Sequence, residues 1–241
     1  MEHKRTILVT GASGGIGAAV AQRYLEGGWR VGLMARRAEA LREVAQDHPD
    51  AVVLPGDVTD EASIADVFDR FCPAGTRLDM LFNNAGIFSP PADIDEMSVE
   101  DWKQAVDVNL TGMFLAARAA FGRMKRQSPK GGRIVNNGSV SAHVPRPGAA
   151  AYTATKHAVT GLTRQISLDG RPHDIACGQI DIGNARTPML EDLAAKSDVE
   201  IPMMDVAEVA EAVWSMGGLP VTTNVQFMTI MATQMPYIGR G

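Results

Sequence analysis

The stretch "TILVTGASGGIG", residues 6–17, decides which fold the sequence predicts. A short apolar run typical of a strand leads directly into a glycine-rich turn, and the turn opens a segment with helical spacing over 17–28. Gly11 would permit the tight turn, Gly15 would let a pyrophosphate approach the backbone, and Gly17 would let helix and strand pack closely. Free N–H groups at the start of the helix would then face the phosphates of a dinucleotide.

Strand-like runs alternate with helical stretches along the rest of the chain, and this alternation distinguishes the turn from an ordinary glycine loop. Further strands are predicted at 30–35, 51–58, 78–86, 132–139, 175–183 and 225–232, and helices near 38–47, 60–72, 98–126, 150–168 and 205–217. The pattern predicts a parallel sheet with right-handed crossovers and helices on both faces. Because no linker, repeat or low-complexity segment interrupts it, residues 1–241 are expected to form one doubly wound α/β domain.

The composition is that of an ordinary globular protein, with 45% hydrophobic and 21% charged residues. A net charge of -5 without a long basic run argues against a nucleic-acid partner. Cys72 and Cys177 match no metal-ligand spacing and are expected to be reduced, buried thiols. The start of the sequence resembles neither a signal nor a transit peptide, and no apolar stretch reaches the roughly 18 residues of a membrane span. We therefore expect a cytoplasmic protein with no metal and no membrane partner.

Tyr152 and Lys156 lie four positions apart in the predicted helix 150–168, which places both side chains on one helical face. A positive charge nearby favours the ionised phenol and lowers its pKa from about 10. Such a phenol could exchange protons near neutral pH. In the alternative interpretation Tyr152 is an ordinary half-buried helix residue and Lys156 is solvated, and the pair alone does not decide between the two.

The predicted strand 30–35 ends in "MARR" (34–37), at the point where a dinucleotide-binding fold contacts the adenosine ribose. NAD-binding proteins usually place an acidic residue there, whereas this chain has Ala35, followed by Arg36 and Arg37. A guanidinium without a neighbouring carboxylate favours a 2′-phosphate. We therefore expect NADP(H) to be preferred, with NAD(H) as the alternative cofactor. For Arg37 a solvated helix start stays open as another interpretation.

The ordered set of motifs resembles the short-chain dehydrogenase/reductase family from about residue 5 to residue 190. The motifs are "TGASGGIG" (10–17), "NNAG" (83–86), Asn109 in "DVNLTG", Ser139, and Tyr152-x-x-x-Lys156. The resemblance implies a seven-stranded Rossmann-type sheet and a nicotinamide cofactor. It also implies oxidation of an alcohol or reduction of a carbonyl in a small-molecule substrate, by a homodimer or homotetramer.

The resemblance further implies a role for each matching residue. Tyr152 would donate and accept the proton, Lys156 would lower its pKa and bind the nicotinamide ribose, and Ser139 would hold the substrate oxygen. Asn109 would kink its helix and anchor a water that relays protons to Lys156. The expected cofactor-binding residues are Gly11, Ser13, Gly15, Ile16, Gly17, Arg36, Arg37, Asp57, Val58, Asn84, Ala85, Gly86, Tyr152, Lys156, Gly183 and Thr187.

Two segments depart from the family pattern. Ile182-Gly183 stands where the family usually has Pro-Gly, and Gly183 is expected to keep its close backbone approach in a loop of altered geometry. The ending "TQMPYIGRG" (233–241) replaces the usual glycine-rich end, and either disorder or docking on a neighbouring subunit is expected of it.

The expected substrate loop spans 187–204 and carries no charge cluster that identifies a substrate. Met189, Met203 and Met204 are the candidates for its apolar wall, whereas Met228 and Met231 are expected in ordinary packing. His143 and Pro145 should overhang the same cleft. We expect His143 to be a hydrogen-bonded loop residue rather than an acid.

Two other functions compete with that of an NADP-dependent oxidoreductase acting on a secondary alcohol or a ketone or aldehyde. A catalytically silent dinucleotide sensor or scaffold could share the fold, but it would not need the set Asn109, Ser139, Tyr152 and Lys156. An epimerase or dehydratase could use the same tyrosine and lysine. The roughly 50 residues after Thr187 leave little room for the longer substrate domain that usually accompanies that chemistry.

Overall fold

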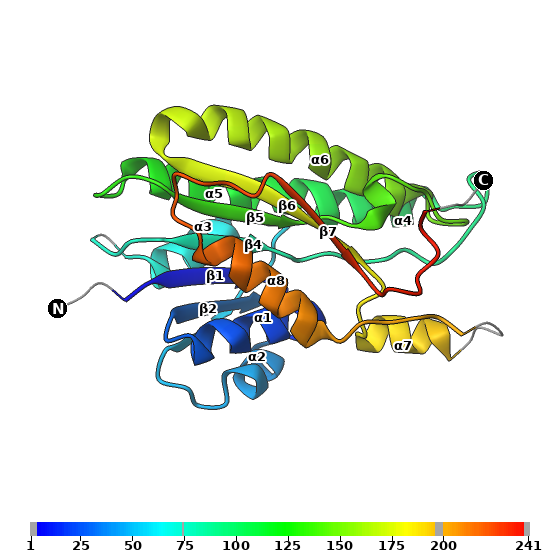
Figure 1. Ribbon diagram of the computed structural model, residues 1–241, viewed down its shortest axis with the longest axis horizontal. Helices are drawn as coiled ribbons and strands as arrows, with labels where there is room; N and C mark the ends of the chain where they lie inside the picture. The colour runs from blue at the N-terminus through cyan, green and yellow to red at the C-terminus, as the bar shows by residue number, and fades with distance from the viewer. Residues whose placement is uncertain (1–3, 74, 196–199, 239–241) are drawn as a thin grey trace.

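A seven-stranded, wholly parallel sheet forms the centre of the protein (Figure 1). The computed structural model describes residues 4–73, 75–195 and 200–238. The strands are β1 (Thr6–Thr10), β2 (Arg30–Ala35), β3 (Ala51–Pro55), β4 (Met80–Asn83), β5 (Gly132–Asn137), β6 (Ile175–Gly183) and β7 (Phe227–Met231). Their spatial order is β3-β2-β1-β4-β5-β6-β7. This arrangement confirms the predicted doubly wound α/β fold.

Helices cover both faces of the sheet (Figure 1). One face carries α1 (Gly15–Glu26), α2 (Ala38–Ala45) and α8 (Val206–Gly218), and the other carries α3 (Glu61–Phe71), α4 (Val99–Val106), α5 (Met113–Arg126) and α6 (Ala150–Gly170). Strands between two helical layers are apolar on both sides, which explains why every residue of β1 is buried. A further helix, α7 (Pro188–Ala194), which the sequence analysis does not predict, lies beyond the carboxyl ends of the strands.

The helical stretch predicted at 98–126 consists of α4 and α5 joined by a π-helical turn over Asp107–Gly112. The turn contains Asn109, whose side chain is fully buried. At Gly112 an added Cβ would lie 2.8 Å from Cγ2 of Val58, so the turn packs tightly against the segment after β3. Single π-helical turns of this kind frequently occur at functional sites.

Strand order reverses next to β1, because β2 and β3 lie on one side of it and β4 to β7 lie on the other. Ligands of open α/β sheets bind at the carboxyl ends of the strands, where the order reverses. We therefore expect the ligand site at the carboxyl ends of β1, β4 and β5. No helix within the described residues is both long and apolar enough to cross a lipid bilayer.

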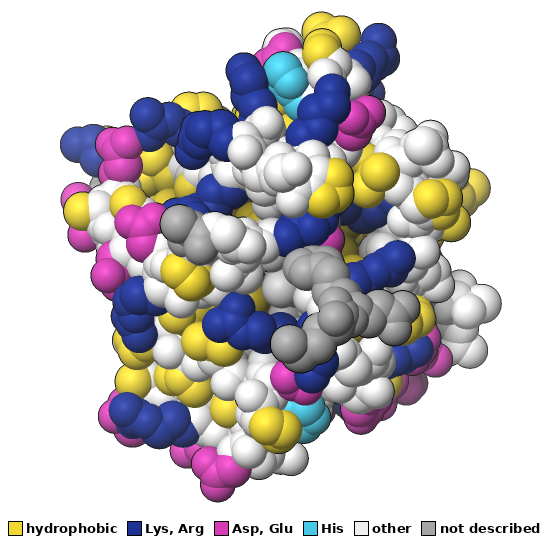
Figure 2. Space-filling view, turned by 90° about the vertical axis from the view of Figure 1, so that its left-hand side faces the viewer, with side chains coloured by type: hydrophobic (Ala, Val, Ile, Leu, Met, Phe, Trp, Pro, Cys, Tyr) yellow, Lys and Arg dark blue, Asp and Glu magenta, His cyan; other side chains and the backbone are white. Residues whose placement is uncertain are grey.

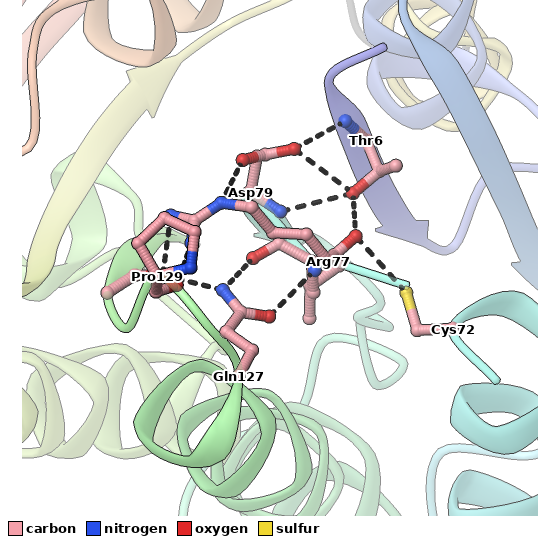
Figure 3. Close-up of polar contacts among 8 residues, drawn as sticks. Thr6, Cys72, Arg77, Asp79, Gln127 and Pro129 are labelled. Carbon is pink, nitrogen blue, oxygen red and sulfur yellow. Dashed lines mark hydrogen bonds and ion pairs between the residues drawn. The ribbon is translucent and has the colours of Figure 1, made fainter. Parts of the chain in front are cut away.

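At the amino ends of the strands, a partly buried polar cluster around Asp79 connects neighbouring segments (Figure 3). Its carboxylate accepts hydrogen bonds from the backbone N–H of Thr6 at 2.9 Å and from Nε of Arg77 at 2.6 Å. Gln127 joins the cluster by accepting from the N–H of Leu78 and donating to the carbonyl of Leu78, both at 2.9 Å. These bonds hold the start of β1, the approach to β4 and the end of α5 together.

The face that Figure 2 presents carries charges of both signs, with Lys and Arg side chains scattered over it and Asp and Glu among them. Lys4 pairs with Asp50 at 2.7 Å, and Lys130 pairs with Asp174 at 3.3 Å. Exposed pairs contribute little to stability because water and salt screen them. We infer that the partly buried cluster, rather than the exposed pairs, holds the amino ends of the strands together.

Replacing Asp79 by Ala should lower the free energy of unfolding by about 1–3 kcal/mol, because the Thr6 N–H loses its acceptor and Arg77 loses its carboxylate partner in a partly buried position. Asp66→Ala is the matched control, since it removes an exposed carboxylate from an i,i+4 pair with Arg70 and should cost less than about 0.5 kcal/mol. Urea unfolding of both variants measures the difference. Equally small losses of unfolding free energy in both variants would show that the cluster does not hold the amino ends of the strands together.

Candidate active site

The turn between β1 and α1 is an open cradle made by glycines. Gly11 and Gly15 have φ values of +67° and +52°, in the left-handed region that favours glycine. An added Cβ at Gly17 would lie 2.2 Å from the carbonyl oxygen of Gly11, so no larger residue fits there. At Gly14, by contrast, nothing lies within 4 Å of an added Cβ, and α1 begins without a side-chain cap. The free N–H groups of this helix end fit a phosphate.

The "NNAG" segment (83–86) lies directly beside this turn. Thr10 Oγ1 accepts hydrogen bonds from the N–H groups of Asn84 and Ala85, at 2.9 Å and 3.0 Å. The side chain of Asn84 donates to the carbonyl of Thr10 at 3.0 Å. An added Cβ at Gly86 would lie 3.3 Å from Asn109 Oδ1. The structure thus brings two of the predicted cofactor-binding motifs together where the strand order reverses.

Two residues after β6 border the same cradle. Thr187 lies over the glycine turn, with Cγ2 3.1 Å from the position of an added Cβ at Gly15. Gly183 is the last residue of β6 and pairs with Met231, and Ile182 pairs with Ile230. Proline at 182 could not donate to a strand ladder, whereas Ile182 has the N–H that a continuous strand needs. The altered loop geometry expected at the Pro-Gly position stays a prediction.

The tail contributes to this region through Met235, which packs against the main core. Its sulfur would lie 2.7 Å from an added Cβ at Gly183. Met235 therefore packs on its own chain, next to the predicted cofactor site, whereas Ile238 is 89% exposed. Disorder or docking of the segment 233–241 stays a prediction. Residues 239–241 lie outside the described part of the chain, as do 196–199 of the expected substrate loop.

The methionines of the expected substrate loop differ in burial and in their contacts. Met204 is 6% exposed and belongs to the main core, so its placement in the pocket wall is wrong. The cause is a pair of backbone hydrogen bonds, in which Met204 donates to the carbonyl of Asn184 and accepts from the N–H of Arg186. Met203 is half-buried, and the side chain of Met189 lies outside the described structure. Met228, expected in ordinary packing, does pack against the core.

The carboxyl ends of β2 and β3 present the residues predicted at the adenosine end. Arg36 and Arg37 are both exposed, and neither forms an ion pair within the described residues. Asp57 accepts hydrogen bonds from the N–H and the hydroxyl of Thr59, both at 2.9 Å. The guanidinium groups therefore stand available to an anion, whereas the Asp57 carboxylate is bound in its own turn.

Lys156 is buried, with 3% of its surface exposed, so the interpretation as a solvated residue is wrong. Its Nζ donates to the carbonyl of Asn137 at 2.7 Å. The side chain of Asn137 in turn donates to Oδ1 of Asn84 at 2.8 Å, which links the lysine to the "NNAG" segment. Burial lowers the pKa of Lys156 to about 8, and the negative charge of Asp181 acts in the opposite direction.

Tyr152 is half-buried and stacks on Phe88, with ring centroids 3.9 Å apart and planes at 19°. Burial raises the pKa of the phenol, a hydrogen bond with the side chain of Ser139 and the charge of Arg146 lower it, and the charge of Asp181 raises it. The expected lowering by Lys156 is therefore not the dominant effect here. Nζ of Lys156 lies 5.5 Å from the phenol ring centroid and donates to the backbone instead.

Ser139 follows β5 and begins a short 3-10 turn, η2 (Val140–Ala142). It is 3% exposed, and its Oγ accepts from the N–H of Ser141 at 3.1 Å. Asn109 lies further inside. Its Oδ1 accepts from the N–H of Ile87 at 2.7 Å, and its Nδ2 donates to the carbonyl of Ile87 at 2.9 Å. The predicted water relay from Asn109 to Lys156 stays a prediction.

Sequence reasoning missed the most deeply buried acid of the site, Asp181 in β6. Its Oδ1 accepts from the N–H of Ser139 at 3.0 Å, and its Oδ2 lies 2.8 Å from Nε2 of His143. His143 is thus the hydrogen-bonded loop residue that the sequence analysis expects, with a charged partner that it does not. The signal available in the sequence was an aspartate inside the otherwise uncharged strand "IACGQIDIG" (175–183). No group of three or more metal-ligating side chains occurs in the part of the chain that the structure describes.

Comparison with known proteins agrees with this arrangement. The short chain dehydrogenase family matches residues 5–198. An uncharacterized oxidoreductase, YxjF, of Bacillus subtilis is 37% identical over 79% of this chain and 74% of its own. The 2-(R)-hydroxypropyl-CoM dehydrogenase of Xanthobacter autotrophicus is 36% identical over 89% of this chain and 91% of its own. The closed form of a serine dehydrogenase complexed with NADP+ superposes with a TM-score of 0.89 over 98% of both chains, at 26% identity. The chain therefore belongs to the short-chain dehydrogenase family and is an NAD(P)-dependent oxidoreductase with a Rossmann-type fold.

Proposed function

We propose that the protein interconverts a secondary alcohol and a ketone or aldehyde with NADP(H), and that Tyr152 is the general acid and base. The observation that carries the proposal is the hydrogen-bonded connection from Lys156 through Asn137 and Asn84 to the carbonyl of Gly11 in the glycine turn. Nζ of the same lysine lies 5.5 Å from the ring centroid of Tyr152. A protein that only binds a dinucleotide has no use for a phenol beside a buried ammonium. We further propose that residues 1–241 act as one domain in the cytoplasm.

The residues of the cradle fit a dinucleotide. The glycines at 11, 15 and 17 leave room for the backbone to approach a pyrophosphate, and the uncapped start of α1 offers N–H groups to it. Asn84, Ala85 and Gly86 would border the cofactor ribose, and Asp57 and Val58 the adenine. Thr187 and Gly183 would border its carboxamide end. The bound nicotinamide supplies the hydride acceptor or donor.

The chain's own residues handle the proton and the substrate oxygen. In alcohol oxidation Tyr152 would take the hydroxyl proton, and in carbonyl reduction it would return one, so that the oxygen never carries a full negative charge. The hydroxyl of Ser139 would donate a hydrogen bond to that oxygen. Lys156, held by the Asn137 carbonyl, would favour the ionised phenol while it keeps its charge. A general acid or base of this kind contributes about 10²–10⁴-fold to the rate.

The substrate class is tested by following reduced-nicotinamide absorbance with two panels. Ketones, sugars and acyl thioesters are assayed with the reduced cofactor. Hydroxyalkyl thioethers and hydroxy amino acids, suggested by the names of the relatives, are assayed with the oxidised cofactor. Turnover with one class identifies it. A complete absence of turnover together with tight cofactor binding would favour the sensor or scaffold function.

Tyr152→Phe should keep the fold and the cofactor affinity but lose about 10²–10⁴-fold in turnover, because only the transferable proton is removed. Tyr24→Phe is the matched control. Its hydroxyl is buried in the core and donates to the carbonyl of Val213 at 3.1 Å, so its loss should affect stability and leave turnover nearly unchanged. Steady-state kinetics and cofactor titration measure both effects. Turnover of Tyr152→Phe within tenfold of the unmodified protein would disprove the assignment.

Arg36→Ala should weaken NADP binding about ten- to a hundredfold and leave NAD binding nearly unchanged, because a charge-assisted contact to the 2′-phosphate is lost. Adding Ala35→Asp should reverse the preference in favour of NAD, because the new carboxylate can accept hydrogen bonds from the ribose hydroxyls. Arg42→Ala, which removes an exposed guanidinium paired with Glu39 on α2, is the matched control and should change neither affinity. Low-salt fluorescence titrations measure the constants. An equal loss for both cofactors would count against the NADP preference.

We also propose that the protein assembles as a homodimer or homotetramer through the helices of 98–126 (α4 and α5) and of 150–168 (α6). Large apolar side chains are exposed on this face: Val99 is 68% exposed, Trp102 42% and Phe114 47%. Light scattering should give a mass that is a multiple of 25.7 kDa, and Phe114→Glu should reduce it, because a charge then enters the apolar contact. A monomer at micromolar concentration would contradict the proposal.

A further inference from the structure

Gln179 is a fully buried glutamine in β6, two residues before the buried aspartate of the site. Its Nε2 donates to Oδ1 of Asp181 at 2.7 Å and to the hydroxyl of Thr160 at 3.0 Å, and its Oε1 accepts from the hydroxyl of Thr163 at 3.0 Å. A carboxylate oxygen can only accept, so the amide nitrogen has to face Asp181. One side chain thus forms three hydrogen bonds in a buried position, and these bonds fix the orientation of its amide.

Two of these bonds bind Gln179 to the helix that carries the tyrosine and the lysine of the site. Thr160 and Thr163 follow Lys156 on α6 by four and seven positions, so the three side chains lie on one helical face. The hydroxyl of Thr160 donates further to the carbonyl of Lys156 at 3.3 Å. Gln179 thereby holds this face of α6 to β6 one helical turn after Lys156.

The third bond connects Gln179 to the segment that carries Ser139. Oδ1 of Asp181, which accepts from Gln179, also accepts from the backbone N–H of Ser139 at 3.0 Å. An added Cβ at Gly138 would lie 2.7 Å from Nε2 and 2.8 Å from Cγ of Gln179, so the backbone before Ser139 packs directly on this glutamine. The position of Ser139 therefore depends on the side chain of Gln179 through a shared carboxylate oxygen and through a close backbone contact.

Thr163 continues the series of hydrogen bonds towards the centre of the sheet. Its hydroxyl accepts from Nδ2 of Asn136 in β5 at 2.9 Å, and Oδ1 of Asn136 accepts from Nδ2 of Asn83 in β4 at 3.3 Å. The four members Asn83, Asn136, Thr163 and Gln179 are at most 1% exposed. Each of them donates to the next, and the series ends at the carboxylate of Asp181. A buried polar network in which the members are paired makes its surroundings rigid.

We propose that Gln179 is a positioning residue that fixes α6, and with it Tyr152, relative to Ser139. It acts through its hydrogen-bonded neighbours, and the inference rests on the roles proposed for Tyr152 and Ser139 in the reaction. Proton and hydride transfer require closely aligned groups, so a small displacement between the helix and the serine lowers turnover even when both ligands still bind. A glutamine that serves only core stability makes a different prediction, namely a lower free energy of unfolding with unchanged turnover.

Gln179→Met removes the amide and keeps an unbranched, adaptable side chain. Turnover should fall about ten- to a hundredfold while KM and cofactor affinity stay within about twofold, because alignment matters most in the transition state. The matched control is Gln127→Met, which removes an amide from the cluster at the amino ends of the strands (Figure 3) and should lower stability without changing turnover. Steady-state kinetics, cofactor titration and urea unfolding measure these effects. A loss of turnover no larger than in the control would overturn the inference.

Thr163→Val tests the same connection with a smaller change, since only the hydroxyl is replaced by a methyl group. Turnover should fall less than in Gln179→Met. The double variant should lose no more turnover than Gln179→Met alone, because both substitutions break one hydrogen-bonded unit. Thr163→Val also provides the test if Gln179→Met does not fold. Unchanged turnover in Thr163→Val, or fully additive losses in the double variant, would overturn the inference.

A second readout does not depend on turnover. Amide hydrogen exchange should become faster in Gln179→Met at residues 138–142 and 152–163, and it should stay unchanged there in Gln127→Met. If exchange changes in this way while the unmodified protein turns over no substrate, the proposed function fails and the positioning role stands. If the unmodified protein is active and Gln179→Met differs from the control in neither readout, only the positioning role fails. An equal rise of exchange over the whole sheet would show a structural role alone and would overturn the inference.

Discussion

The contact between α1 and the turn that precedes it constrains the whole site. An added Cβ at Gly17 would meet the carbonyl of Gly11 at 2.2 Å, so helix and turn are as close as backbone atoms allow. That carbonyl also accepts from Asn84 at 3.3 Å, and Asn84 accepts from Asn137, whose own carbonyl receives Nζ of Lys156. Four segments distant in the sequence are thereby fixed in one line from the glycine cradle to the catalytic helix. A displacement of the turn would move the lysine with it.

Burial and charge act against each other along this line. Nζ of Lys156 donates to one carbonyl in a buried position, and burial lowers its pKa to about 8 against the opposing charge of Asp181. Burial also raises the pKa of Tyr152, so burial favours the neutral state of both groups, whereas the Ser139 side chain and the charge of Arg146 favour the phenolate. Asp181 supports the charged lysine but opposes the charged phenol. The same carboxylate accepts from the backbone N–H of Ser139, so Asp181 affects the site both by its charge and by a direct contact.

The fold followed from the sequence because its signals are local. Apolar runs of strand length and the glycine turn at 10–17 predict β1, α1 and the parallel sheet, and the structure confirms them. Short α7 lacks such a signal. The tyrosine and lysine of the site share one helix, so their spacing reveals them, whereas Asp181 and His143 lie 38 positions apart and meet only through the fold. Met204 was misplaced for the same reason, because its contact with Asn184 is set by tertiary structure.

The amino ends of the strands contribute mainly to stability, whereas the carboxyl ends form the ligand site. At the amino ends of the strands, Asp79, Arg77 and Gln127 form hydrogen bonds with one another's segments and hold these together (Figure 3). At the carboxyl ends of the strands, the backbone N–H groups at the uncapped start of α1 and the exposed guanidinium of Arg36 are available to a ligand. Such groups stabilise the protein less than paired ones would, since their best partner is absent until a ligand binds. Because the amino ends of the strands are held by paired polar groups, the carboxyl ends can keep polar groups for ligand binding. Cofactor binding should therefore stabilise the folded chain.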